Sequence, residues 1–310
     1  MLGLYRKKSL DDVFDTSEGA LPFRLQRVAD DELGETSTRR KEALEKLEQL
    51  ISEEPDFNVS KDKDFLLRFL RVRKYNVDAA MQSIRKYYSD RAACQSVYCD
   101  FLPSTITPAA RILTMALPGK DAHGRLVLLV KLGAWKPQEV SHTLFQRAGL
   151  IVLEHLITDP TAQTLGVCLL MDCHELSVDH VMSLNVGLIK RVLQYFQDGM
   201  PARLKAFHVV REGRAFDMLY CIMKPFLKKK LASRFRFHGY NFEDFHKEIS
   251  PQILPEELGG QSPALDFDAF WSEMDQLETV FAANSRCGYT RKRVNDFATE
   301  EEIEKSLEFF

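Results

Sequence analysis

The sequence predicts an α/β fold in which an all-helical N-terminal domain precedes a mainly parallel β-sheet flanked by helices. From residue 36 to about 99, apolar residues recur at the three- and four-residue spacing of amphipathic helices. Beyond about residue 105, short uninterrupted apolar runs alternate with helical patterns. Strands buried on both faces have such runs, and their alternation with helices is typical of βαβ units. The length of 310 residues suits about two domains of roughly 150 residues each.

Three helices are expected in the N-terminal domain. The first follows Thr36, where Ala43, Leu47 and Ile51 share one face. The second begins near Lys61. The third opens at Asn76 or Val77, and Asp78 lies in its first turn, where the helix dipole favours an acid. Only a short helical pattern, 21–33, precedes them.

The sheet domain should contain at least four strands. A turn signal at 121–124 precedes the first of them. The expected strands are 125–131, 165–171, 204–210 and 235–237. The expected helices between them are 143–158, 178–197 and 215–231. Pro225 should kink or end the last helix, because proline removes one backbone donor.

Composition excludes several classes of protein. Lys and Arg number 42 against 45 Asp and Glu, so the net charge of −3 does not indicate a nucleic-acid partner. No apolar run approaches the roughly 18 residues that a membrane span needs. The N-terminus has charges after five residues and no apolar segment, so we predict no secretory signal. The six cysteines form no Cys-x-x-Cys pair, which favours free thiols in a cytosolic protein and no metal site.

The search for catalytic motifs is nearly empty. The sequence has no phosphate-binding glycine loop, zinc-protease motif or nucleophile elbow. Cys173 and His174 follow a predicted strand, where α/β sites usually lie, but neighbouring residues on one turn rarely point at each other. We expect a strand-end turn there, with Asp172 as its capping acid. Glu154 and His155 lie in a largely apolar helix, either as satisfied polar residues or as ligand contacts.

The segment from 211 to 238 combines an apolar helix with a basic run. Its helix is apolar over most of its circumference, which requires apolar partners on more than one side. Six cations then occur within thirteen residues: Lys224, Lys228, Lys229, Lys230, Arg234 and Arg236. Such a run is either a solvated face or a patch that docks on anionic lipid. Stacking aromatics are not interleaved with the cations as in nucleic-acid modules, so we expect no nucleic-acid partner.

Several motifs occur in a definite order along the chain. The first are Phe65-Leu-Leu-Arg-Phe-Leu-Arg-Val-Arg-Lys-Tyr75 and Tyr87-Tyr-Ser-Asp-Arg91. They are followed by Gln197-Asp-Gly-Met-Pro-Ala-Arg203, Lys224-Pro-Phe-Leu227, His238-Gly239 and Leu254-Pro-Glu-Glu-Leu-Gly-Gly260. This set resembles the CRAL-TRIO (Sec14-like) family: the first two motifs resemble its helical N-terminal signature and the others its lipid-binding domain. The resemblance covers about 36–275 and is greatest to the branch of the α-tocopherol transfer protein and cellular retinaldehyde-binding protein.

This resemblance implies a domain plan. Residues 1–35 are an N-terminal extension, 36–100 the helical domain and 101–275 the lipid-binding domain. Residues 276–310 form a C-terminal tail, in which a capping-box start at Thr299 predicts a short helix over 300–309.

The resemblance also implies a non-catalytic cytosolic carrier without a cofactor, which encloses one hydrophobic lipid and exchanges it at membranes. We expect a monomer that associates peripherally with endosomal or other phosphoinositide-bearing membranes. The phosphoinositide-binding positions that match are Arg73, Arg203, Lys205, Lys230 and Arg234. The matching lipid-pocket positions are Gly149, Leu153, Val167, Met171, Val192, Tyr195, Phe196 and Met200.

A mobile gate over the cavity is implied at about 215–230. Its matching residues are Phe216, Leu219, Tyr220, Met223 and Leu227. The chain departs from the family at Arg211-Glu-Gly213, where Asn-x-Pro is usual, and glycine in place of proline should loosen the start of the gate. Several pocket positions also differ from the tocopherol carrier's, so the ligand does not follow from the resemblance.

Two functional hypotheses remain open from the sequence. One is the lipid carrier, triggered by phosphoinositide contact. The other is an adaptor that uses a Sec14-like module to sense phospholipid and place partners on membranes. An enzyme built on Cys173 and His174 is a distant third.

Overall fold

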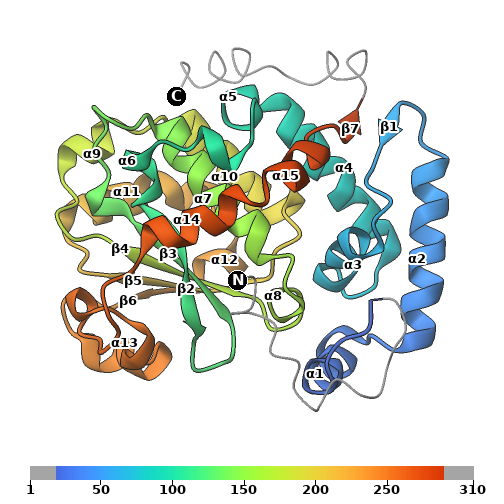
Figure 1. Cartoon of the computed structure of the whole chain (residues 1–310), viewed down its shortest axis with the longest axis horizontal. Coiled ribbons are helices and arrows are strands. Elements are labelled where there is room, and N and C mark those ends of the chain that lie inside the picture. Colours follow the sequence, from blue (N-terminus) through green and yellow to red (C-terminus); the bar gives the residue numbers. More distant parts are fainter. Residues whose placement is uncertain (1–18, 290–310) are drawn as a thin grey trace.

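The computed structural model describes residues 19–289 (Figure 1). The predicted C-terminal helix at 300–309 lies outside the described residues. Between these limits the chain has a helical N-terminal part and a five-stranded sheet with helices on both sides, so the predicted fold class is confirmed.

The helices of the N-terminal part begin close to where the sequence predicts. Thr36 accepts a hydrogen bond from the Arg39 amide, and Asn76 accepts one from the Ala79 amide, so both act as N-caps. Asp62 caps the helix between them. The elements are α1 (Phe23–Leu33), α2 (Ser37–Ser52), β1 (Phe57–Asn58), α3 (Lys63–Val72), α4 (Val77–Ala93) and α5 (Gln95–Tyr98).

The central sheet has the strand order β2-β3-β4-β5-β6, and β3 to β6 are parallel. The strands are β2 (Thr114–Lys120), β3 (Leu126–Lys131), β4 (Val167–Asp172), β5 (Leu204–Val210) and β6 (Phe235–Phe237). The edge strand β2 was not predicted; it pairs antiparallel with β3, and Pro118 and Gly119 interrupt its apolar run. A separate two-stranded sheet pairs β1 with β7 (Gly288–Tyr289).

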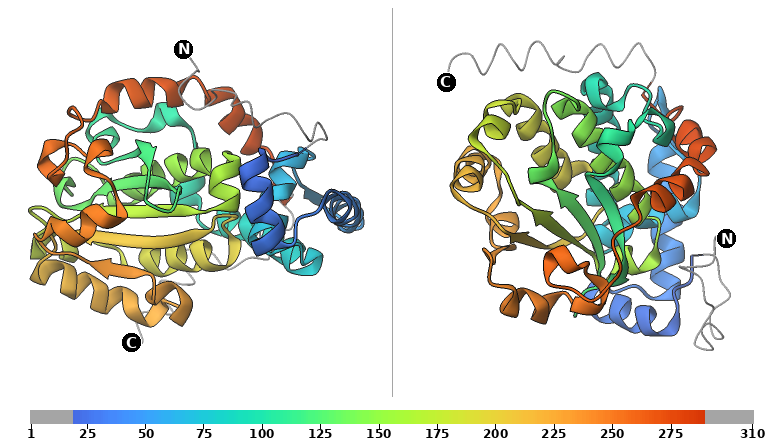
Figure 2. Two further views of the ribbon diagram at one scale, coloured as in Figure 1. Left: turned by 90° about the horizontal axis from the view of Figure 1, so that it is seen from below. Right: turned by 60° about the vertical axis from the view of Figure 1, so that its left-hand side comes forward.

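Each face of the sheet contributes alternate residues to a separate apolar cluster. Leu128 and Leu169 face α7 (His142–Leu156), α10 (Val186–Gln194) and α11 (Arg214–Met223). Leu129 and Leu170 face α13 (Phe242–Glu248). Figure 2 shows the sheet nearly edge-on with helices on both sides. The helices not yet given are α6 (Pro108–Arg111), α8 (Pro160–Thr164), α9 (Val178–Met182), α12 (Lys229–Ala232), α14 (Phe267–Asp275) and α15 (Glu278–Asn284).

Two predicted helices are shorter than expected. The helix expected at 178–197 is broken: α9 ends at Met182, and Asn185 caps α10 by accepting a hydrogen bond from the Leu188 amide. A π-helical turn, Tyr195–Gly199, then follows α10. The helix expected at 215–231 ends at Met223, and a short 3-10 turn contains Pro225, as its missing amide predicts.

A buried ion cluster joins the helical domain to the sheet domain. Glu35 is fully buried and accepts from Arg71 at 2.8 and 3.0 Å and from Arg40 at 3.3 Å. Arg71 also donates to the Gln163 side chain on α8. We call Glu35, Arg40, Arg71 and Gln163 the junction cluster.

Candidate functional site

Three of the five predicted head-group cations converge at the amino-terminal ends of β5 and β6. Arg203 immediately precedes β5, and Lys205 lies in it at a β-bulge, where the pairing with β4 shifts register. Arg234 precedes β6 and donates to the Leu204 carbonyl. We call Arg203, Lys205 and Arg234 the cation cluster.

Gly166, immediately before β4, lies very close to Arg203 and Lys205 of the cation cluster. Its φ of +102° is unfavourable for other residues. A Cβ at this position would lie 2.4 Å from the Arg203 carbonyl oxygen and 2.6 Å from Lys205 Cγ. A side chain here would therefore push Arg203 and Lys205 away from the sheet.

Burial, and after it the crowding of like charges, disfavours the charged forms of the cation cluster. Burial lowers the pKa of Lys205, and the neighbouring Arg203 lowers it further. Burial and then Arg203 likewise lower the pKa of Arg234. Such a cluster favours an anionic ligand, because an anion relieves the repulsion.

An acid that sequence reasoning missed already contacts the cation cluster. Glu32, on α1, lies 2.7 Å from Arg203 Nη2 and 3.2 Å from Lys205 Nζ. Hydrogen bonds from Arg203 hold the pKa of Glu32 below its ordinary value. No local pattern in the sequence signals this contact, since Glu32 and Arg203 are 171 positions apart.

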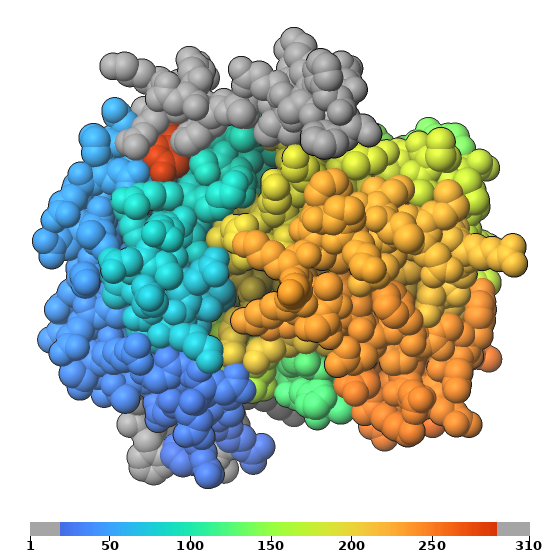
Figure 3. Space-filling model, turned by 180° about the vertical axis from the view of Figure 1, so that it is seen from behind, coloured from blue at the N-terminus to red at the C-terminus, as the bar shows by residue number. Residues whose placement is uncertain are grey.

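The other two predicted cations lie apart from the cation cluster. Arg73 ends α3 and donates to Ser83 Oγ at 2.5 Å and to the Asp198 carbonyl at 2.7 Å. Lys230 is exposed on α12. Within residues 19–289, no hydrogen bond or ion pair links either side chain to the cation cluster. The back of the molecule is hollowed between the blue-to-cyan helical domain and the orange segment, with a yellow floor (Figure 3).

The predicted gate covers one face of the sheet. Phe216 and Leu219 on α11 are buried in the core, and Tyr220, Met223 and Leu227 are half-buried against it. The segment predicted as a gate is therefore packed against the core in this structure.

Both ends of the gate are anchored by side chains. At its start, Arg211 pairs with Asp172 through two hydrogen bonds, and Glu212 accepts from the Gly239 amide at 2.9 Å. At its end, Gln197 donates to the Phe226 carbonyl at 3.0 Å. These contacts oppose the looseness expected from Gly213.

Exposed apolar side chains gather beside the gate. Met182 on α9 is 75% exposed, and Val178, Val186 and Met218 are each at least 40% exposed. Helix α11 packs beside both α9 and α10 (Figure 1). We call Val178, Met182, Val186 and Met218 the apolar rim. It was not predicted, because the sequence indicated one continuous helix over 178–197.

The predicted lipid-pocket residues fall into three groups. Deeply buried in the main core are Leu153, Val167, Val192, Tyr195 and Met200. Met171 and Phe196 are half-buried. Gly149 lies in the middle of α7, and a Cβ built on it meets no heavy atom within 4 Å.

The space beside Gly149 is therefore open. Val192 and Tyr195 also line a cavity of about 190 Å³ next to α4 and α5. This volume is smaller than the roughly 300–1,000 Å³ of most ligand pockets.

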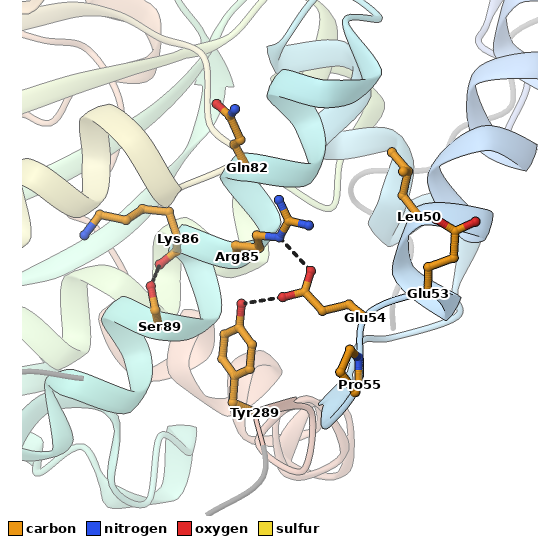
Figure 4. A pocket seen from close by; sticks show the side chains of 9 residues that line it. All are labelled: Leu50, Glu53, Glu54, Pro55, Gln82, Arg85, Lys86, Ser89 and Tyr289. Atoms are coloured by element: carbon orange, nitrogen blue, oxygen red, sulfur yellow. Dashed lines mark hydrogen bonds and ion pairs between the residues drawn. The ribbon is translucent and has the colours of Figure 1, made fainter. Parts of the chain in front are cut away.

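A larger pocket lies elsewhere, against the helical domain. It has a volume of about 670 Å³, and Figure 4 shows its mixed polar lining. Among its lining residues, Glu54 accepts a hydrogen bond from Arg85 at 2.6 Å and one from the Tyr289 hydroxyl at 3.4 Å. None of the predicted lipid-pocket residues lines it.

The candidate catalytic pair is unfavourable for nucleophilic chemistry. Cys173 is buried, and burial raises the pKa of its thiol, whereas His174 is largely exposed. Glu154 accepts from Arg91 and from the Tyr195 hydroxyl, both at 3.2 Å, which makes it a satisfied core residue.

Three further properties concern the described part of the chain. All six cysteines, which fall within it, are free thiols. Residues 19–289 contain no group of three or more His, Cys, Asp or Glu side chains that could hold a metal ion. None of their helices is long and apolar enough to cross a membrane.

Comparison with known proteins identifies two domains. Residues 113–260 match the CRAL/TRIO domain, and residues 26–86 match the CRAL/TRIO N-terminal domain. The human alpha-tocopherol transfer protein-like protein is 36% identical over 251 residues, 80% of this chain and 73% of the relative. Rat clavesin-1 is 32% identical over 240 residues, 76% of this chain and 68% of the relative. The crystal structure of Sfh5 matches over 92% of this chain and 96% of its own, at 13% identity and a TM-score of 0.44.

Proposed function

Because the chain belongs to the CRAL/TRIO family of lipid-binding proteins, we propose that it is a non-catalytic carrier of one hydrophobic lipid. The name of the human relative points to tocopherol, and retinoids or similar isoprenoids are the other candidates. The carrier takes up and releases this lipid at membranes, where it associates peripherally and as a monomer.

The cation cluster is the observation that carries the membrane part of this proposal. Arg203, Lys205 and Arg234 come from two strand starts yet crowd together, although their mutual repulsion opposes it. A phosphoinositide head group supplies phosphate oxygens that several cations can bind together. Arg73 and Lys230 belong to the proposed site as well, because they match the family's other head-group positions.

The gate and the apolar rim support the transfer step. Phe216 and Leu219 face the core, whereas Met218 and Met182 face outward. On a membrane, the apolar rim would enter the interface while cations near the surface contact anionic lipid, each contributing about 1 kcal/mol. Opening of α11 would then expose the apolar core that Phe216 and Leu219 cover. Such a carrier works between the cytosol and phosphoinositide-bearing membranes such as endosomes.

Lipid extraction tests the carrier directly. Protein purified from cells should yield one dominant hydrophobic lipid by mass spectrometry, at up to one molecule per chain. Gly149→Leu should lower that amount while the protein stays folded, because the new side chain enters open space. A chain that remains empty after exposure to tocopherols, retinoids and phospholipids contradicts the proposal.

The adaptor remains a second candidate because of the larger pocket. Its 670 Å³ and its polar lining between α2 and α4 suit a partner other than a lipid tail. An adaptor predicts membrane recruitment that survives Val167→Phe and Phe196→Trp. A carrier predicts that lipid transfer fails in both variants.

A further inference from the structure

Glu32 occupies the position in the cation cluster that an anionic oxygen of a ligand would take. One carboxylate oxygen, Oε2, accepts from Arg203 Nη2 and from Lys205 Nζ. The two donors come from either side of Leu204, so a single oxygen bridges them. A phosphate oxygen would bind the same pair of donors in the same way.

Arg203 cannot meet a ligand while Glu32 stays. The side chain of Arg203 is only 8% exposed. Its Nη1 donates to the Thr164 carbonyl, and its Nη2 donates to Glu32. A phosphate therefore reaches Nη2 only after the Glu32 carboxylate has moved away.

The Glu32 side chain can move without unfolding α1. It is 46% exposed, so it can rotate into water. The backbone around it is held independently, since Ala29 and Leu33 are buried and Glu35 belongs to the junction cluster. Gly34 ends α1 in the left-handed conformation, with φ of +68°.

We propose that Glu32 is a place-holder anion, which holds the cation cluster together in the unbound protein and is displaced when a phosphomonoester head group binds. This inference rests on the proposed function, because it assumes that the cation cluster binds a phosphoinositide. A phosphomonoester carries nearly two negative charges and three acceptor oxygens, so it can bind Arg203, Lys205 and Arg234 together, as one carboxylate cannot. Glu32 therefore lowers the affinity for the head group and stabilises the unbound state by the same free energy.

The test uses the full chain carrying Glu32→Gln, which keeps the shape of the side chain and removes its charge. Asp31→Asn is the matched control, because Asp31 is the exposed neighbour on α1 and has no contact with the cation cluster. The probes are soluble inositol 1,4,5-trisphosphate, measured by calorimetry, and phosphatidylcholine vesicles with 5 mol% phosphatidylinositol 4,5-bisphosphate, measured by cosedimentation. Thermal unfolding is followed with and without saturating trisphosphate.

Glu32→Gln should tighten binding of both probes about fivefold, the effect expected for one charge near the site. The variant should melt below the wild type without ligand, and the difference should vanish at saturation. Asp31→Asn should change neither measurement.

Three results would overturn parts of the account. If the wild type and Glu32→Gln both bind trisphosphate with equal affinity, Glu32 is not a place-holder, but the proposed head-group site is supported. No binding by either protein overturns the head-group site and, with it, this inference. Tightening for the soluble probe but not for vesicles supports the place-holder and overturns a lipid as the source of the phosphate.

Discussion

Two glutamates three positions apart, Glu32 and Glu35, lie in ion clusters of opposite character. Glu35 is fully buried in the junction cluster, where Arg71 binds both of its oxygens and Arg40 adds a third contact. Glu32 contacts the cation cluster with a side chain that is 46% exposed. Each cluster connects the helical domain to the sheet domain, the junction cluster through the contact of Arg71 with Gln163.

The exposure of the acid decides whether a ligand can replace it in an ion pair. Removing one partner of a buried pair leaves an uncompensated charge away from water, at a cost of roughly 3–5 kcal/mol. An exposed pair contributes about 0–1 kcal/mol, because water replaces the lost partner. The junction cluster therefore fixes the domains, and the cation cluster can exchange its acid for another anion.

The largest expected effect is on the junction cluster. Glu35→Gln should lower the free energy of unfolding by about 3–5 kcal/mol, because Arg71 and Arg40 lose their buried partner. Urea unfolding followed by circular dichroism measures it. Glu32→Gln in the same assay should cost less than about 1 kcal/mol, and equal losses in the two variants would break the comparison.

A pH titration should separate the ion clusters from the histidines. Burial lowers the pKa of His208 from 6.5 to about 4, so the unfolded state takes up the proton first as the pH falls. The stability that neutral His208 contributes is complete above pH 6.5 and is lost towards pH 4, by about 3 kcal/mol. Unfolding measured across this range checks the slope.

Two variants decide the origin of that slope. His208→Gln should reduce the slope without abolishing it, because burial also lowers the pKa of His142 to about 4. Glu32→Gln should leave it unaltered between pH 6.5 and 5, because the pKa of Glu32 lies below its ordinary value of 4.5. If the pH dependence of stability disappears in Glu32→Gln, then Glu32 and not a buried histidine titrates in this range.

Affinity for phosphoinositide vesicles should depend strongly on the cation cluster. The double variant Arg203→Gln with Lys205→Gln should weaken binding to phosphoinositide vesicles about 25-fold, at roughly 1 kcal/mol for each cation. Lys229→Gln is the control, since Lys229 is exposed on α12 and was not predicted to bind the head group. A control that loses as much affinity would mean that net charge, rather than this site, attracts the membrane.

The smallest effect concerns salt. Raising the ionic strength from 0.1 to 0.5 M should weaken vesicle binding by the wild type severalfold, because exposed charges are screened. The cost of Glu35→Gln should hardly change, since buried pairs are screened much less. A salt-sensitive junction cluster would show that water reaches it.

Much of the fold followed from local patterns, and the site followed only in part. The strands at 204–210 and 235–237 are confirmed to the residue, although only β5 is almost entirely buried and Arg236 and Phe237 of β6 are exposed. The edge strand β2 escaped prediction because Pro118 and Gly119 interrupt its run.

The candidate site shows where sequence reasoning stops. Basic residue types at matching positions pointed to Arg203, Lys205 and Arg234, and the structure brings them together. Glu32 could not be predicted, since a contact across 171 positions depends on how α1 packs on the sheet domain. The apolar rim was missed for a local reason, the N-cap at Asn185 that breaks the expected helix.

Lipid transfer between vesicles tests the central claim, that head-group binding at the cation cluster drives exchange of the carried lipid. A fluorescent tocopherol analogue would be loaded on the wild type and on the Arg203→Gln, Lys205→Gln double variant. Its transfer to acceptor vesicles would then be timed with and without 5 mol% phosphatidylinositol 4,5-bisphosphate. The account predicts that this lipid accelerates transfer by the wild type and not by the double variant. Equal acceleration in both proteins, or none in either, would contradict it.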